Sequence, residues 1–322
     1  MKRVDVKEAA ARLREGGLVA IPTETVYGLG ANADDAGAVA QIFAVKGRPT
    51  NHPLIVHVAD VAALDAWARE VPPSARRLAE LFMPGPLTLV LPKQPDVLDD
   101  VTGGLDSVGL RIPNHPVALA LLTEFARLRG ARAGIAAPSA NRFGSVSPTR
   151  AAHVEADLEG EDVALLDGGA CEVGVESTIV DCTQAAGPRV LRLGGIPRDE
   201  LEAALGGPVP LANAGEVRAP GTLASHYAPR ARLIACALGE VDLRVADARA
   251  DGLRVGVWAH EAPREADTFV PASGESRMRA RELYDVLRKL DAAVDVIVVA
   301  LPEQDGVGEA IIDRLRRAST PR

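Results

Sequence analysis

Residues 18–30 read LVAIPTETVYGLG, and this stretch indicates how the first domain is built. Its four leading residues are apolar and end at Pro22, which is the pattern of a short buried strand. Two hydroxyls, a carboxylate and a phenol follow at once: Thr23, Glu24, Thr25 and Tyr27. Polar side chains at the end of a buried strand are typical of ligand sites in α/β proteins. A turn whose threonines satisfy local backbone groups would explain the same residues.

Short predicted strands and helices alternate after this stretch. Apolar residues at helical spacing predict helices at residues 6–13, 36–45 and 117–128. Apolar and β-branched runs predict strands at residues 53–58, 87–91, 108–112, 134–137, 163–166, 177–180 and 190–193. Because the elements do not follow a strict βαβ order, we expect an α/β domain with a mixed, twisted sheet.

The composition changes after Glu202. Residues 205–230 are rich in Gly, Pro and Ala and predict a linker between domains at 1–204 and 231–322. Within the second domain, strands are predicted at 232–235, 254–258 and 294–301, and helices at 276–290 and 308–317. This order predicts a small parallel α/β domain.

Composition and charge exclude several classes of protein. The 322 residues carry a formal net charge of −8, which disfavours a surface that grips nucleic acid throughout but allows a local basic pocket. No apolar run approaches the ~18 residues of a membrane span, and no signal peptide is apparent. Cys171, Cys182 and Cys236 cannot all pair and lack zinc-site spacing. We expect a cytoplasmic protein without a membrane anchor or a protein-held metal.

Two cations lie one residue apart at Lys46 and Arg48, followed by His52. A lysine supplies a point charge and an arginine a planar fork, and together they suit a cluster of anionic oxygens. The alternative is a solvated helix end whose cations face the negative end of the helix dipole.

Two polar residues interrupt strands that are otherwise apolar. Arg111 needs a partner there, which would be either a structural salt bridge or a substrate carboxylate. His57 would ordinarily be a core histidine.

Small and polar residues fill the later loops. Candidate positions are Ala137, Ser139, Asn141, Ser145 and Ser147, then residues 174–178 and 192–195. Small residues let backbone and hydroxyl donors approach a ligand closely. The sequence has no G-x-x-x-x-G-K-[ST] loop, no H-E-x-x-H motif and no G-x-S-x-G motif. The residues alone therefore predict a pocket with cations, hydroxyls and small side chains.

Taken in order, these segments resemble the YrdC-type family of threonylcarbamoyl-AMP synthases. The K-x-R pair, Lys46 and Arg48, and the S-x-N pair, Ser139 and Asn141, carry the resemblance. Further motifs match in the same order at residues 22–30, 84–88, 108–113 and 174–178, so that the likeness spans nearly all of residues 1–200.

The rest of the chain resembles the two-domain branch of that family. In that branch a linker ending in H-Y-A-P leads to a Rossmann-like domain, and residues 226–229 match it. Residues 222–224 read TLA where many members have Met-Lys-Tyr, so the lysine of that motif is absent here.

The resemblance implies an enzyme, a nucleotidyltransferase that condenses L-threonine, bicarbonate or CO2, and ATP to threonylcarbamoyl-AMP and pyrophosphate. The product would serve threonylcarbamoyladenosine formation beside the tRNA anticodon, through a downstream tRNA threonylcarbamoyl transferase complex. It implies no catalytic side chain beyond positioning and charge stabilisation by Lys46 and Arg48, because in-line attack at phosphorus mainly requires these. Magnesium would arrive with the ATP, without a protein cage.

The resemblance also assigns residues to the two substrates. Threonine would be bound by Thr25, His57, Arg111, Ala137 and Ser177, with Arg111 on its carboxylate. ATP would be bound by Lys46, Arg48, His52, Ser107, Ser139, Asn141, Ser147, Arg192 and Tyr227. Glu24 and Asp106 either orient cations or cap loops, and we leave them out of the site. We expect residues 219–229 to form a lid that protects the carbamate from water, because a Gly/Pro-rich tether beside a pocket can hinge.

Three alternatives stay open. A double-stranded RNA-binding or ribosome-maturation protein would need a local basic patch, and the net charge leaves room only for weak RNA binding. A carbamoyltransferase of the hydrogenase-maturation kind shares this domain, but its zinc-binding cysteine pairs and acylphosphatase segment are not visible. A family member that has lost activity is disfavoured by the matching signature residues.

Overall fold

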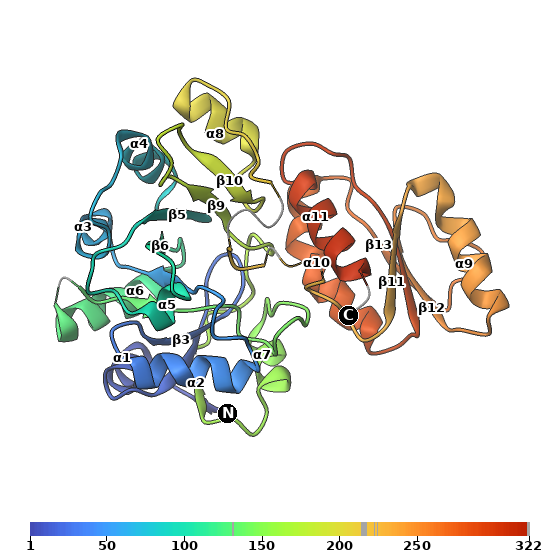
Figure 1. The fold of residues 1–322 in the computed structure, drawn as a ribbon. Coiled ribbons are helices and arrows are strands. Elements are labelled where there is room, and N and C mark those ends of the chain that lie inside the picture. The colour runs from blue at the N-terminus through green and yellow to red at the C-terminus, as the bar shows by residue number, and fades with distance from the viewer. Residues whose placement is uncertain (131, 214–217, 222, 224, 321–322) are drawn as a thin grey trace. The chain divides into compact units, whose positions relative to one another are not determined.

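The structure, a computed structural model, describes residues 1–130, 132–213, 218–221, 223 and 225–320. The chain divides into two compact units (Figure 1). The first comprises Met1–Phe143 and Pro148–Thr222, and the second comprises Gly144–Ser147 and Leu223–Arg322. The described helices include none that is long and apolar enough to cross a membrane.

The described part of the first unit contains a ten-stranded sheet in the order β1-β8-β2-β3-β7-β4-β6-β5-β9-β10. The strands are β1 (Lys2–Arg3), β2 (Leu18–Ile21), β3 (Gly28–Asn32), β4 (Ile55–His57), β5 (Leu87–Pro92), β6 (Ser107–Arg111), β7 (Ile135–Ala136), β8 (Val163–Leu165), β9 (Thr178–Asp181) and β10 (Arg189–Arg192). Parallel pairs such as β4/β6 and β5/β9 occur beside antiparallel pairs such as β2/β3 and β5/β6. The predicted mixed sheet is confirmed.

Helices of the first unit pack on this sheet. They are α1 (Val6–Arg14), α2 (Ala36–Lys46), α3 (Leu64–Trp67), α4 (Pro73–Phe82), α5 (Asp99–Thr102), α6 (Pro116–Arg129), α7 (Ala151–Asp157) and α8 (Arg198–Leu205). Local chemistry sets their ends: a capping box between Asp5 and Glu8 starts α1, and the Asp35 side chain accepts from the Ala38 N–H at the start of α2.

Strand β6 shows which face of the central sheet carries polar and small residues. Side chains alternate along a strand, so Val108 and Leu110 point to one face and Ser107, Gly109 and Arg111 to the other. Val108 and Leu110 are buried in the main hydrophobic core of the unit. The opposite face therefore carries the polar and small residues of the strand.

The predicted linker begins as part of the first unit. Helix α8 ends at Leu205, and the chain then runs beside β10, where Val190 donates to the carbonyl of Pro210 over 2.8 Å and accepts from Ala212 over 2.9 Å. Residues 214–217, 222 and 224 of the predicted linker lie outside the described residues.

The described part of the second unit contains a four-stranded parallel sheet in the order β11-β14-β12-β13. Its elements are β11 (Arg232–Cys236), α9 (Val241–Ala250), β12 (Val255–Ala259), β13 (Thr268–Pro271), α10 (Ser276–Asp291), β14 (Val296–Ala300) and α11 (Gly308–Ser319). Helices α10 and α11 lie on one side of this sheet and α9 on the other (Figure 1). The Rossmann-like parallel architecture is confirmed.

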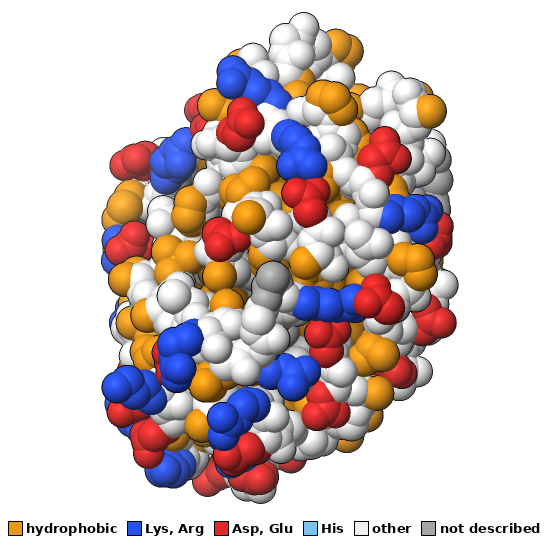
Figure 2. Space-filling model, turned by 90° about the vertical axis from the view of Figure 1, so that its left-hand side faces the viewer, with side chains coloured by type: hydrophobic (Ala, Val, Ile, Leu, Met, Phe, Trp, Pro, Cys, Tyr) orange, Lys and Arg blue, Asp and Glu red, His pale blue; other side chains and the backbone are white. Residues whose placement is uncertain are grey.

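Charges are mixed on the face of the molecule shown in Figure 2. Lys and Arg side chains alternate there with Asp and Glu, without a broad area of one sign. Such a face lacks the continuous positive surface that binding to nucleic-acid phosphates requires.

Candidate active site

The K-x-R motif contacts the S-x-N motif through Lys46. Helix α2 ends there because Gly47 adopts a left-handed conformation (φ 63°), and the Arg48 N–H donates to the Phe43 carbonyl over 3.0 Å. The Lys46 Nζ donates to the carbonyl oxygens of Ser139 and Asn141, each over 2.6 Å. Lys46 is buried, so the solvated-helix-end interpretation is wrong.

The charge of Lys46 is held by backbone dipoles. Its described hydrogen bonds go to carbonyl oxygens, and no described carboxylate forms a salt bridge with it. Burial lowers the pKa of Lys46 well below its ordinary value, and the neighbouring charge of Arg48 lowers it further. A cation in this environment is stabilised by an incoming anion, since phosphate oxygens would favour its charged form.

Arg48 lies beside Lys46 and is also buried. Its Nη2 donates to the Pro53 carbonyl over 3.0 Å, and its guanidinium lies 5.7 Å from the centre of the Phe143 ring. The His52 ring meets the same ring edge-on at 5.7 Å. Partial burial, followed by the charges of Arg48 and Arg218, lowers the pKa of His52. The predicted ATP residues Lys46, Arg48, His52, Ser139 and Asn141 thus form one cluster.

A second cluster surrounds Arg111 at the end of β6. Parallel pairing of β4 with β6 places His57 opposite Arg111. The Arg111 Nη2 lies 2.8 Å from the Glu24 Oε2, and each side chain is about 5% exposed. Burial and the charge of Arg111 lower the pKa of His57 to about 3, so His57 is neutral at physiological pH. Of the two partners expected for Arg111, the structure shows the salt bridge, and Glu24 supplies the carboxylate.

Glu24, which the sequence interpretation left outside the site, faces a cation, as the first of its two expected roles requires. It contacts Arg111, whereas Asp106 pairs with exposed Arg69 over 2.7 Å. The signal was present in the sequence: a carboxylate directly after a buried strand and an arginine inside an apolar one each need a partner.

The threonine turn after β2 behaves as its local chemistry predicts. The Thr23 Oγ1 accepts from the N–H groups of Thr25 and Val26, each over 3.2 Å, and donates to the Val26 carbonyl over 2.6 Å. Thr25 is buried, and its Oγ1 lies 2.9 Å from the Thr23 Oγ1. The turn thus fixes Thr25 one residue beyond Glu24.

A third cluster joins Ser177 to Arg192. The Arg192 Nη2 donates to the Ser177 carbonyl over 2.8 Å and to its Oγ over 3.1 Å. The Ser177 Oγ also lies 2.8 Å from the Thr88 Oγ1, a contact that sequence reasoning missed. Thr88 interrupts the apolar alternation of β5, and this polar interruption is the signal that could have identified it.

Residues 218–221 lie across the open face of the sheet. Ala219 is buried against Ile55 and Ile179, and the Arg192 Nη1 donates to the Pro220 carbonyl over 2.9 Å. The Arg218 Nη1 donates to the Asn51 carbonyl over 2.8 Å.

Beneath this segment is a small cavity of about 20 Å³. Its lining includes Ser107, Gly109, Thr88 and Ile55. A wider cleft of about 680 Å³ shares Ser107 and Arg218 with it and is also lined by Arg69 and Asp181. Ser107, a predicted ATP residue, therefore lies between the covered and the open part of this face.

The remaining predicted site residues lie in both units of the chain. Ala137 is buried next to β4, where its N–H donates to the Ile55 carbonyl over 3.0 Å. Ser147 and Tyr227 belong to the second unit, and their part in an ATP site stays a prediction. Tyr227 adopts a positive φ of 63° and stacks on Tyr284 at 5.9 Å.

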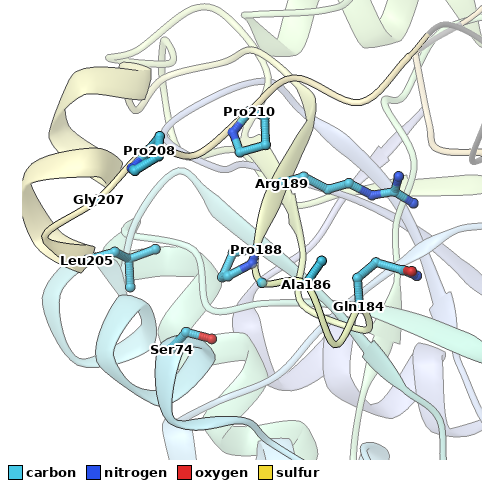
Figure 3. Close-up of a pocket in the computed structure, with 10 residues that line it drawn as sticks. Ser74, Gln184, Ala186, Pro188, Arg189, Leu205, Gly207, Pro208 and Pro210 are labelled. Carbon is cyan, nitrogen blue, oxygen red and sulfur yellow. The ribbon is translucent and has the colours of Figure 1, made fainter.

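Another cavity, of about 390 Å³, contains none of the predicted site residues. It is lined by residues of the α4 and α8 ends and of the turn before β10, including Ser74, Gln184, Pro188, Leu205, Pro208 and Pro210 (Figure 3). Arg189 also borders it, and its guanidinium pairs with Asp181 over 3.1 Å. The described residues hold no group of three or more His, Cys, Asp or Glu side chains suited to a metal ion.

Fold and site together define a two-unit α/β protein whose first unit carries buried cations and hydroxyls near the ends of its strands and of helix α2. Comparison with known families is consistent with this description. A family model described as "Telomere recombination" (Sua5/YciO/YrdC) matches residues 11–194, and one described as "Threonylcarbamoyl-AMP synthase, C-terminal domain" matches residues 196–320. The chain belongs to the Sua5/YciO/YrdC family and has its two-domain form.

Relatives are similar over almost the whole chain. A threonylcarbamoyl-AMP synthase of Pyrococcus abyssi is 42% identical, with 98% of this chain and 94% of the relative covered. One of Bacillus subtilis is also 42% identical, with 98% and 92% covered. The crystal structure of P. abyssi Sua5 complexed with L-threonine has a TM-score of 0.91 at 41% identity, covering 98% of this chain and 94% of that one.

Proposed function

We propose that this protein is an enzyme, an L-threonylcarbamoyladenylate synthase that converts L-threonine, bicarbonate and ATP to threonylcarbamoyl-AMP and pyrophosphate. One observation carries the proposal: the buried Lys46 ammonium joins the carbonyls of Ser139 and Asn141, so that both signature motifs of the family form one cationic cluster. The full-length likeness to threonylcarbamoyl-AMP synthases supports it.

Two neighbouring regions would divide the substrates between them. The cluster of Lys46 and Arg48 would bind the phosphates, because charge-assisted hydrogen bonds to phosphate are strong and buried cations gain from an anionic partner. The region of Arg111 would bind threonine, with its carboxylate on the guanidinium. The likeness to a protein solved with L-threonine supports threonine as the substrate.

The chemistry then needs positioning more than a nucleophilic side chain. The threonine amine would capture bicarbonate as a carbamate, and a carbamate oxygen would attack the α-phosphorus of ATP in line, with pyrophosphate as the leaving group. Lys46 and Arg48 would offset the charge that develops on the phosphate oxygens. Magnesium would come with ATP and keep most of its waters, since no protein cage is required for such a metal.

Residues 219–229 would act as a lid that excludes water from the carbamate. The described contacts of residues 218–221 support this role, because they cover the sheet face next to Ser107, Thr88 and Arg192. The product would be a mixed anhydride, and a tRNA threonylcarbamoyl transferase complex would consume it. We expect the reaction to take place in the cytoplasm.

Pyrophosphate release tests the proposal. Purified protein with ATP and magnesium should release pyrophosphate only when both L-threonine and bicarbonate are present, and mass spectrometry should detect threonylcarbamoyl-AMP. Release that is independent of threonine or of bicarbonate would contradict the proposal. Removal of residues after 215 should sharply reduce product formation, and unchanged turnover would contradict the lid.

A further inference from the structure

Buried polar atoms without hydrogen-bond partners surround Arg111. Within the described chain, both carboxylate oxygens of Glu24, the Nδ1 of His57, and the Nε and Nη2 of Arg111 have no such partner. Buried polar groups in folded proteins are nearly always hydrogen-bonded. Five exceptions on three neighbouring side chains indicate a place where a polar ligand binds.

The ion pair in this cluster is close but poorly aligned. The Arg111 Nη2 lies 2.8 Å from the Glu24 Oε2, yet neither atom forms a hydrogen bond. At this distance, the N–H groups of Arg111 must point away from the carboxylate oxygen. The guanidinium fork is therefore free to bind a second carboxylate in the bidentate manner that Arg favours.

The charges of the pair match those of a free α-amino acid. An amino acid carries one carboxylate and one ammonium group on the same carbon, and the pair offers one guanidinium and one carboxylate. Exchange of partners would leave every charge neutralised and the net charge of the cluster unchanged, so no uncompensated charge is buried when the ligand enters.

We propose that Glu24 binds the α-ammonium group of the substrate and accepts a proton from it, while Arg111 binds the substrate carboxylate. This inference rests on the proposed function, in which the amine must become a nucleophile, and it adds one catalytic residue to the site.

The other titratable groups that face Glu24 are unsuited to this proton transfer. Arg111 is a cation, and the pKa of His57 is lowered to about 3 by burial and by Arg111, so His57 is a poor base. Burial, followed by the charge of Glu24, raises the pKa of the Cys171 thiol to about 12, so it stays protonated at neutral pH. Among these four side chains, the carboxylate of Glu24 is the one suited to accept the proton.

The backbone holds Glu24 where this transfer needs it. The Val173 N–H donates to the Glu24 carbonyl over 2.7 Å, and the Thr23 turn fixes the residue that follows. The carboxylate is thus presented from a rigid strand end, as a positioned base requires.

The proton balance of the step is complete with bicarbonate. The ammonium gives one proton to the Glu24 carboxylate, and the nitrogen lone pair forms a bond to the bicarbonate carbon. The bicarbonate hydroxyl leaves with a second nitrogen proton as water. The products are the carbamate, which keeps one N–H, a water molecule and a protonated Glu24.

Binding experiments with Glu24→Gln separate this role from a structural one. Calorimetry would compare L-threonine with 3-hydroxybutyrate, the deamino compound, which keeps the carboxylate and the hydroxyl but has no donor group in place of the amine. We expect the variant to lose at least tenfold in affinity for threonine and to bind the deamino compound as the wild type does. Equal losses for both compounds would mean that Glu24 only orients Arg111, and would overturn the proposal.

The pH dependence of pyrophosphate release tests the proton transfer. Without its base, Glu24→Gln should depend on the free amine in solution, so its rate relative to the wild type should rise about tenfold per pH unit until the amine has titrated. The bicarbonate concentration also changes with pH, but it changes equally for both proteins and so does not affect the ratio of their rates. A ratio that stays flat would overturn the proposal.

Two further variants serve as references in the same assays. Glu24→Asp keeps a carboxylate and should recover part of the activity with the pH dependence of the wild type, even where Glu24→Gln folds poorly. Glu124→Gln makes the same exchange at an exposed pair with Arg127 and should match the wild type. A wild type that releases no pyrophosphate with threonine and bicarbonate would overturn the proposed function as well. An active wild type with an unaffected Glu24→Gln would overturn the role of Glu24 alone.

Discussion

The Nζ of Lys46 lies 2.6 Å from the carbonyl oxygen of Asn141, although 95 residues separate the two in the chain. The contact links the end of α2 to a loop that follows β7, and it is made to a backbone dipole and not to a carboxylate. A carbonyl satisfies an ammonium only in part, so Lys46 keeps electrostatic attraction for a phosphate group.

Lys46→Met should therefore impair the use of ATP selectively. The change keeps the length of the side chain and removes a charge-assisted interaction worth roughly 1.5–3 kcal/mol, which corresponds to about a tenfold or greater increase in the KM for ATP. Steady-state pyrophosphate release at varied ATP measures this, with threonine affinity expected to stay the same. Lys7→Met, at an exposed position of α1, is the matched control. An unchanged KM for ATP would exclude Lys46 from the nucleotide site.

Arg111→Lys should instead impair the use of threonine. Lysine keeps the positive charge opposite Glu24 but loses the planar fork, so the bidentate contact with a carboxylate is lost. We expect the KM for threonine to rise about tenfold or more while the KM for ATP stays constant. Unlike Glu24→Gln, this variant should bind threonine and its deamino analogue equally poorly. Arg127→Lys, at an exposed ion pair of α6, should behave as the wild type, and full retention of threonine affinity in Arg111→Lys would contradict the carboxylate assignment.

Most strands with β-branched sequences were predicted, whereas β13, with the sequence TFVP, and β3 were not. The sequence of β3, GLGAN, has two glycines and no β-branched residue, and so it has low strand propensity. The structure explains the glycine: a Cβ on Gly30 would lie 2.9 Å from the Ile135 Cγ2 and 3.1 Å from the Val19 carbonyl. Close packing against the neighbouring strands thus requires glycine at position 30. Glycine has low strand propensity, so the sequence pattern does not predict this strand.

Residue types of the site could be predicted, and most of their partners could not. An arginine inside an apolar strand revealed Arg111 as a residue that needs a counter-charge. That Glu24 supplies it depends on where the end of β2 lies relative to β6, which no local pattern encodes. The contact of Lys46 with Ser139 spans 93 residues and is likewise a product of the sheet order. The family resemblance could group these residues, but only the fold shows which atoms meet.

Ala219→Asp should lower product formation and pyrophosphate release together, because a carbamate lost to water never reaches ATP. Ala219 is buried against Ile55 and Ile179, so a carboxylate there would be desolvated without a partner and would lift residues 218–221 from the sheet. Water would then reach the carbamate, and we expect the yield of threonylcarbamoyl-AMP to fall several-fold. Chromatography of the products measures it. Ala152→Asp, at an exposed position in the first turn of α7, is the control, and a normal yield from Ala219→Asp would show that this segment does not exclude water.

His57 should make the folded protein sensitive to acid. Its pKa is about 3 in the folded chain against an ordinary value of 6.5, because burial and Arg111 disfavour the imidazolium. Below pH 6.5 the unfolded chain binds a proton at this histidine that the folded chain does not bind. The free energy of unfolding contributed by neutral His57 is therefore complete above pH 6.5 and is lost as the pH falls toward 3.

The loss from this residue approaches about 1.4 kcal/mol per pH unit between pH 6 and pH 4. Urea denaturation of the wild type and of His57→Asn over this range isolates it, because the carboxylates contribute equally to both proteins. The variant should be less stable at pH 7 if the imidazole packs well, but its stability should decline less steeply with acid. His260→Asn, at an exposed position, should keep the slope of the wild type. Parallel curves for the wild type and His57→Asn would mean that water or a carboxylate compensates the protonated ring, and that the region around Arg111 is more polar than its burial implies.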